Sequence, residues 1–268
     1  MNQRRRNVLP LNKVKVDDFF WNKYTRLVTD QIIPYQWEAL NDRVEDAEPS
    51  HCIKNFEIAA GLCKGEFKGA VFQDTDLAKW LEAVAYSLAY EPDAELEKRA
   101  DAMIDLIGKA QQPDGYLDTY FIIKEPDKKF CNLREGHELY TAGHFMEAAV
   151  AYYQVTGKEK FLHIMQRVAD LICEVFHQEA FQQAVPGHEE VEIGLIRLYQ
   201  VTGERRYLEM AKDFVDTTVE PVVTYESGLL GGTDVIRLSG KRMDAEAWSS
   251  DALYAEKRVP LKETELTR

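Results

Sequence analysis

A helical hairpin that occurs more than once is the feature that most limits how this chain can fold. The segment "AAVAYYQVTGKEKFLHIMQRVADLI" (148–172) resembles "GLIRLYQVTGERRYLEMAKDFVDTT" (194–218), and the shared "YQVTG" begins at residue 153 and again at residue 199. An earlier unit, "EAVAYSLAYEPDAELEKRADAMIDLI" (82–107), follows the same plan without the glycine. Each unit reads as a helix, a tight turn and a second helix. Repeated helical hairpins either stack into an open solenoid or close into a ring.

Helical periodicity extends over most of the chain. Apolar residues recur at i, i+3, i+4 and i+7 in the segments 22–45, 53–64, 75–90, 94–111, 137–156, 158–176, 187–202 and 204–218. Gly157 and Gly203 stand where a left-handed residue ends a helix. Only "VVTYESGLL", near 222–230, reads as short β structure. The sequence therefore predicts an all-α fold of repeated hairpins.

The connections between the hairpins favour a ring over a solenoid. A solenoid usually keeps short linkers and a strict period. Here the linkers at 108–138 and 176–190 are long and rich in polar residues. Loops at one end of successive hairpins converge in space, so we expect a polar cleft at the mouth of a partial α/α toroid. We expect a flexible N-terminal tail (1–13), the toroid domain (14–218) and a divergent, partly irregular C-terminal tail (219–268).

Charge and cysteine content narrow the possible partners and compartments. The formal net charge is -13, which disfavours nucleic acid or an anionic membrane as a partner. No apolar segment reaches the ~18–20 residues of a membrane span. Three arginines at 4–6 precede "NVLPLNKVKVDDFF", which offers no continuous apolar stretch for a signal peptide. The four cysteines are widely spaced and lack zinc-finger spacing, so we expect free thiols in a cytoplasmic protein.

Two histidines stand at equivalent places in successive hairpins. His137 opens "HELYTAGH", and His188 opens "HEEVEIGL" after a Pro-Gly turn. His137 and His144 are seven residues apart, which on a helix separates them by ~10.5 Å along the axis, too far for one metal ion. The plainer interpretation is that these histidines cap and pack helices. The alternative, which their repetition favours, is that His137 and His188 donate hydrogen bonds to a ligand at the mouth while His144 lies deeper.

Other polar side chains give the expected mouth its chemistry. "FQDTDLAKWLEA" (72–83) places Gln73 and Asp74 at another helix start, where Asp74 could instead be a capping residue. "QQPDGYLDTY" (111–120) adds further amide, carboxylate and phenol groups around a turn. A mouth of this kind without a basic cluster suits a neutral polyhydroxylated ligand such as a sugar. No acid stands in an apolar setting that would raise its pKa, so the residues alone indicate no catalytic group.

Several motifs together resemble glycoside hydrolase family 127, the β-L-arabinofuranosidases. They occur in that family's order from about residue 14 to residue 218: "IIPYQWEALNDR", "VFQDTDLAKWLEAVAYSLAYEPDAELE", "AQQPDGYLDTY", "HELYTAGHFMEAAVAYYQVTG" and "PGHEEVEIGLIRLYQVTGERRYL". The resemblance implies an (α/α)6 catalytic barrel and retaining hydrolysis of terminal β-L-arabinofuranosyl groups. It also implies a zinc-bound cysteine nucleophile and a glutamate acid/base. By motif match His137 and His188 would contact the sugar, with Gln73 and Asp74 beside them.

The family's catalytic segments have no counterpart in this sequence. The glutamate acid/base, the zinc-binding segment and the nucleophilic cysteine follow later in the family pattern, and the four cysteines here match none of them. We therefore expect a chain resembling the N-terminal half of such a glycosidase, with part of the sugar site but with no catalytic residue, metal ligand or cofactor. The expected partners are a small neutral sugar or arabinose-containing oligosaccharide, and a second copy or a complementary chain.

Two other interpretations stay open. The chain could be a non-catalytic carbohydrate-binding α/α-toroid protein, or a helical-repeat interaction module without a small ligand. Binding of L-arabinose would separate the interaction module from the other two.

Overall fold

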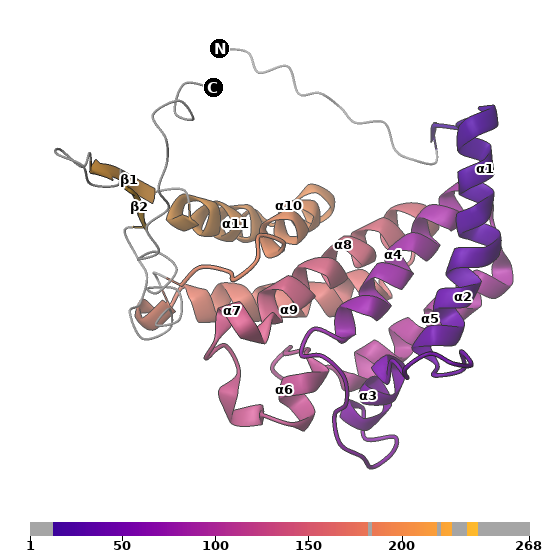
Figure 1. The fold of residues 1–268 in the computed structure, drawn as a ribbon, viewed down its shortest axis with the longest axis horizontal. Coiled ribbons are helices and arrows are strands. Elements are labelled where there is room, and N and C mark those ends of the chain that lie inside the picture. Colours follow the sequence, from indigo (N-terminus) through magenta and orange to yellow (C-terminus); the bar gives the residue numbers. More distant parts are fainter. Residues whose placement is uncertain (1–12, 182–183, 219–220, 227–234, 241–268) are drawn as a thin grey trace.

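In the computed structural model the described residues are 13–181, 184–218, 221–226 and 235–240 (Figure 1). The chain is helical and forms a partial α/α toroid, as the sequence predicts. The elements in order are α1 (Phe19–Leu27), the π-helix η2 (Val28–Ile32), α2 (Ile33–Leu40), α3 (Cys52–Ala59), α4 (Asp74–Tyr90), α5 (Ala94–Ala110), α6 (Thr119–Ile123), η3 (Pro126–Lys128), α7 (Leu133–Gly136), α8 (Glu138–Thr156), α9 (Lys160–Phe176), η4 (Glu179–Phe181), α10 (Val191–Thr202) and α11 (Arg205–Thr218), followed by strands β1 (Pro221–Glu226) and β2 (Val235–Gly240).

The three hairpins expected from the repeat are present as α4–α5, α8–α9 and α10–α11. The two "YQVTG" turns have the same structure. Gly157 (φ +72°) and Gly203 (φ +77°) are both left-handed, and their N–H groups donate to the carbonyls of Tyr153 and Tyr199, each at 2.8 Å. A helix that ends on a left-handed glycine turns back sharply, which is why the pentapeptide marks each hairpin.

The first helices of the hairpins form the inner row of the fold. Helix α8 packs against α4 on one side and α10 on the other, and α9 covers it from the outside. Because α8 is covered all round, most of its side chains are buried, including Phe145 and Met146. The outer helix α9 instead has one apolar stripe and one exposed polar face, the usual pattern of a helix covered on one side.

Two glycines allow α8 and α10 to cross closely. A Cβ atom at Gly143 would stand 2.7 Å from the carbonyl carbon and oxygen of Glu190, and one at Gly194 would stand 2.9 Å from the carbonyl oxygen of Gly143. The main chains of the two hairpins therefore touch where α10 begins. This contact brings the residues just before α10 next to the first turns of α8.

The C-terminal part contains the β structure expected near 222–230. Strand β1 pairs antiparallel with β2, with Pro221 opposite Gly240. Residues 227–234 and most of the predicted tail at 219–268 lie outside the described residues, as does the predicted N-terminal tail apart from Lys13. Within the part that is described, no helix is long and apolar enough to cross a membrane.

Candidate functional site

His137 and His188 meet at the start of the inner helices. Their Nε2 atoms are 2.9 Å apart, and the two rings stack with centroids separated by 4.4 Å. His137 directly precedes α8, and His188 lies three residues before α10. The sequence-based prediction that these imidazoles share one place is confirmed. Their contact with a ligand stays a prediction.

The backbone positions His137 in a way that the sequence did not indicate. The helix predicted for 137–156 begins at Glu138, because His137 is left-handed (φ +57°) and separates α7 from α8. Its Nδ1 lies 2.8 Å from the carbonyl oxygen of Glu135, which can only accept, so Nδ1 carries the proton. In the neutral ring the Nε2 of His137 is then an acceptor, to which the Nε2–H of His188 donates.

The histidine pair, by which we mean His137 and His188, is open to solvent. His188 is exposed, and His137 is half-buried. Partial burial and the neighbouring His137 lower the pKa of His188. Neutral imidazoles at an open surface offer one donor and one acceptor nitrogen each, which matches the needs of hydroxyl groups.

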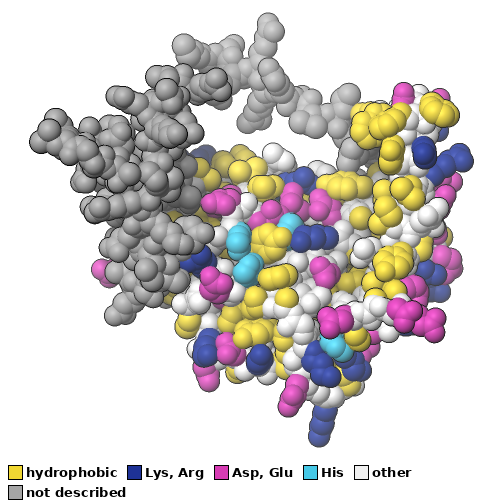
Figure 2. Space-filling model, in the orientation of Figure 1, with side chains coloured by type: hydrophobic (Ala, Val, Ile, Leu, Met, Phe, Trp, Pro, Cys, Tyr) yellow, Lys and Arg dark blue, Asp and Glu magenta, His cyan; other side chains and the backbone are white. Residues whose placement is uncertain are grey.

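Aromatic side chains surround the pair. Tyr140 makes ring contacts with both members, at centroid distances of 5.9 Å to His137 and 5.5 Å to His188, and it also contacts His144 at 4.5 Å. The ring of Phe72, from the turn before α4, lies 5.0 Å from that of His137. Figure 2 shows histidine side chains gathered with apolar ones on this face of the molecule. We call His137, His188, Tyr140 and Phe72 the rim. It combines polar imidazoles with flat apolar surface.

Lys79 of α4 orients the central tyrosine. Its ammonium group donates to the Tyr140 hydroxyl at 3.1 Å and lies 5.2 Å from the centre of the Tyr140 ring. The contact joins α4 to α8 at the same end of the inner row. Three inner helices thus contribute to one rim.

Asp74 and Gln73, the two other predicted site residues, are not part of the histidine pair. The Asp74 side chain is 1% exposed, and its oxygens accept hydrogen bonds from the N–H and hydroxyl of Thr119 at 2.7 and 2.6 Å. It therefore joins α4 to α6. Gln73 is half-buried and donates to Asp76 at 2.7 Å and to Ser50 at 3.3 Å. It holds the turn that carries Phe72.

The structure also contains buried acids, so the expectation that no acid sits in an apolar setting is wrong. Glu138 is 3% exposed and accepts hydrogen bonds from the Tyr116 hydroxyl and from the Phe130 N–H. Burial raises the pKa of Glu138 to about 7 and that of Asp74 to about 6. Burial and the nearby Asp74 and Glu138 raise the pKa of Asp118 as well. No sequence pattern indicates this burial, because it depends on how the 108–138 linker folds over α8.

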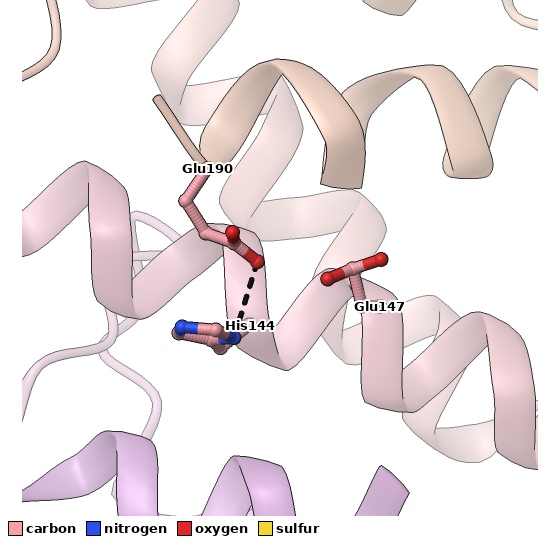
Figure 3. A group of neighbouring side chains, drawn as sticks. All are labelled: His144, Glu147 and Glu190. Carbon is pink, nitrogen blue, oxygen red and sulfur yellow. Dashed lines mark ion pairs between the residues drawn. The ribbon is translucent and has the colours of Figure 1, made fainter. Parts of the chain in front are cut away.

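A second group of polar side chains lies beneath the rim. We call His144, Glu147 and Glu190 the inner cluster (Figure 3). His144 Nδ1 lies 3.1 Å from Glu190 Oε1, and both side chains are largely buried. Burial and nearby Lys79 lower the pKa of His144 to about 4, while burial and Glu147 raise the pKa of Glu190 to about 7. His144 lies deeper than His137, as the sequence predicts, whereas Glu190 is not among the predicted site residues.

The cysteines do not supply the zinc site that the family resemblance implies. All four are free, and Cys52 and Cys173 are buried. Among the residues that the structure describes, the inner cluster is the only set of three or more potential metal ligands, and it contains no cysteine.

Helical hairpins in two layers, with a histidine and aromatic rim at one end of the inner helices, define an α/α-toroid protein. The chain belongs to the β-L-arabinofuranosidase family, glycoside hydrolase family 127, whose catalytic-domain model matches residues 13–254.

Individual relatives agree with this assignment. The chain is 41% identical over 220 residues to the non-reducing end β-L-arabinofuranosidase of Bifidobacterium longum, an alignment that covers 76% of this chain and 33% of the relative. It is 57% identical to the crystal structure of a family 127 β-L-arabinofuranosidase from Geobacillus stearothermophilus T6, with a TM-score of 0.75, covering 76% of this chain and 32% of the other. A second family 127 β-arabinofuranosidase structure is 34% identical with a TM-score of 0.70, covering 78% and 33%. The chain thus spans about one third of the length of these relatives.

Proposed function

We propose that this chain binds an L-arabinofuranosyl sugar at the histidine pair and does not hydrolyse it on its own. The observation that carries the proposal is the meeting of His137 and His188 at the starts of neighbouring inner helices. The names of the relatives, which are β-L-arabinofuranosidases, support the choice of sugar. Gln73 contributes indirectly, through the turn that carries Phe72.

The chemistry of the rim fits a sugar. In the free protein the two imidazoles bond to each other, so a bound sugar would replace that one bond with bonds from its hydroxyl groups to both rings. The faces of Tyr140 and Phe72 offer apolar surface to the C–H groups of the ring. Lys79, which lies beside Tyr140, is engaged with the hydroxyl of that tyrosine.

The absence of hydrolysis is supported in part by the state of the two buried thiols. Burial raises the pKa of Cys52 well above its usual range and that of Cys173 to about 12. Both groups are therefore protonated near neutral pH and are poor nucleophiles. A test is the release of the aryl group from an aryl β-L-arabinofuranoside, with and without added zinc. We expect no release by this chain alone, and zinc-dependent release would contradict the proposal.

Substitution of the histidine pair tests the binding site. We expect His137→Ala or His188→Ala to weaken L-arabinose binding about tenfold or more, because each removes one hydrogen bond to the sugar, worth about 1.4 kcal/mol. Isothermal titration calorimetry measures this directly. His163→Ala is a matched control on α9, since that side chain is 64% exposed. Unchanged affinity in both site variants, or no binding by the unsubstituted chain, would refute the site.

Association and location are part of the same proposal. A second copy or a complementary chain is supported by exposed apolar side chains on α1 and α2, among them Phe19 (94% exposed) and Tyr35 (55% exposed). A cytoplasmic location is supported by the four free thiols, which persist in a reducing compartment. The second candidate function is a carbohydrate-binding α/α-toroid protein with no role in catalysis. Hydrolysis of the aryl glycoside after a complementary chain is added would favour part of a glycosidase over this second candidate.

A further inference from the structure

We propose that His144, Glu147 and Glu190 bind one divalent transition-metal ion of the zinc type, which joins α8 to the start of α10. The proposal is independent of sugar binding, because it concerns a different set of side chains and a different ligand.

The geometry of the inner cluster is that of a nearly formed metal site. One potential ligand atom from each residue lies within 4.8 Å of the other two. His144 and Glu147 are three residues apart on α8 and so share a face, while Glu190 approaches from the segment before α10 (Figure 3). Donors around a tetrahedral zinc ion, each about 2.0–2.2 Å from it, stand about 3–3.5 Å apart. The 3.1 Å between His144 Nδ1 and Glu190 Oε1 already meets that spacing.

The facing atoms lack the partners that buried polar atoms normally have. Both ring nitrogens of His144 and the Oε1 atom of Glu190 are buried without a hydrogen-bond partner. Nδ1 and Oε1 are 3.1 Å apart, yet they do not form a hydrogen bond with each other. Buried polar atoms are almost always satisfied by a partner, so these atoms call for one. A metal ion between them would accept a lone pair from each.

The charges around the cluster also favour a cation. Arg197 Nε contacts Glu147 Oε1 at 2.8 Å, and the Glu147 carboxyl group is also within hydrogen-bond reach of Glu190. In Figure 3 one oxygen of Glu147 points toward the other two side chains and the other points away. Glu82 lies 3.9 Å from the same guanidinium group and adds a third carboxylate. Besides burial, Glu147 and Glu82 both raise the pKa of Glu190, and a divalent ion would offset this repulsion between carboxylates.

The donor set selects the type of metal. One imidazole nitrogen and two carboxylate oxygens suit zinc and its neighbours in the first transition series. Calcium and magnesium prefer sites built of oxygen alone, with six or more ligands. A zinc ion here would connect the inner helix α8 to the start of α10 beneath the histidine pair, and its expected role is structural.

Zinc titration of the chelator-treated, dialysed chain tests the proposal. We expect calorimetry to show one zinc ion bound per chain and the unfolding temperature to rise with zinc, since a ligand that binds only the folded state stabilises it. Glu190→Gln, which keeps the shape of the side chain, and His144→Ala should each weaken zinc binding at least tenfold and remove the rise in unfolding temperature. His163→Ala should bind zinc as the unsubstituted chain does. Circular dichroism establishes that each variant is folded before titration.

Three outcomes would overturn the site. The first is no saturable zinc binding by the unsubstituted chain. The second is unchanged zinc affinity in folded Glu190→Gln. The third is loss of zinc binding in His188→Ala with retention in Glu190→Gln, which would assign the ion to the histidine pair. If zinc does not bind and Glu190→Gln is more stable than the unsubstituted chain, a proton shared by Glu147 and Glu190 explains the cluster instead.

Discussion

Replacing Gly143 by alanine is expected to lower the free energy of unfolding by about 1–3 kcal/mol, the usual cost of inserting a methyl group into tight packing. The new Cβ atom would stand 2.7 Å from the main-chain carbonyl of Glu190. Main-chain atoms cannot rotate aside, so α10 would have to move away from α8. Alanine has the better intrinsic helix propensity by up to about 1 kcal/mol, and the steric overlap is expected to outweigh that gain.

Gly108→Ala is the matched control for this substitution. It places the same methyl group in a helix, α5, where the atom nearest to it is the flexible Cδ1 end of Ile164 at 3.0 Å. Urea unfolding should show Gly108→Ala unchanged or slightly more stable. Gly194→Ala, which approaches the same crossing from α10, should be destabilised like Gly143→Ala. Equal stability of Gly143→Ala and the unsubstituted chain would mean that the two main chains are not in contact.

The buried acids are expected to make the protein less stable as the pH rises from about 4.5 to about 7. The pKa of Glu138 is raised by burial from 4.5 to about 7, so the folded protein holds a proton over this range that the unfolded chain has released. This contribution to stability is fully present below pH 4.5 and is lost as the pH rises through 7. A pKa shift of this size changes the free energy of unfolding by about 3 kcal/mol across this pH range. Asp74, with its pKa raised from 3.8 to about 6, acts in the same direction.

His144 acts in the opposite direction. Burial lowers its pKa from 6.5 to about 4, so its contribution is present above pH 6.5 and is lost as the pH falls through 4. The pH dependence of the whole protein therefore sums opposing groups. A variant that removes one group isolates its contribution.

Glu138→Gln provides that comparison. Glutamine can still accept from Tyr116 or from the Phe130 N–H but does not titrate. We expect the stability of the unsubstituted chain, relative to Glu138→Gln, to fall by about 3 kcal/mol between pH 4.5 and pH 8 in urea unfolding. Glu135→Gln, at an exposed position nearby, is the control. Its stability relative to the unsubstituted chain should stay nearly constant over the same pH range. A constant difference between the unsubstituted chain and Glu138→Gln across this range would show that Glu138 is ionised in the folded state.

Local sequence signals predicted the elements of the fold well. The "YQVTG" turns end α8 and α10 as expected, because a glycine that adopts a left-handed conformation stops a helix within one residue. The apolar periodicity of α4, α8 and α9 predicted their existence and approximate bounds. The helix predicted for 187–202 begins only at Val191, because residues before it form the turn that carries His188. The motifs around His137 and His188 also identified the family correctly.

Turn residues and helical periodicity act over a few neighbouring positions, so they were enough to predict the hairpins and the order of the inner helices. The equivalent places of His137 and His188 in successive hairpins predicted that these two side chains meet. Which acids are buried, and which other side chains converge, depends instead on how the helices pack. Asp74 reads as a capping residue but is held inside by Thr119, and Glu190 reads as a helix-start charge but lies against His144. Such pairs join residues 45 and 46 positions apart along the chain (74 to 119, 144 to 190). Their contact depends on how closely the helices pack, which for α8 and α10 is set by two glycines with no side chain to keep the main chains apart.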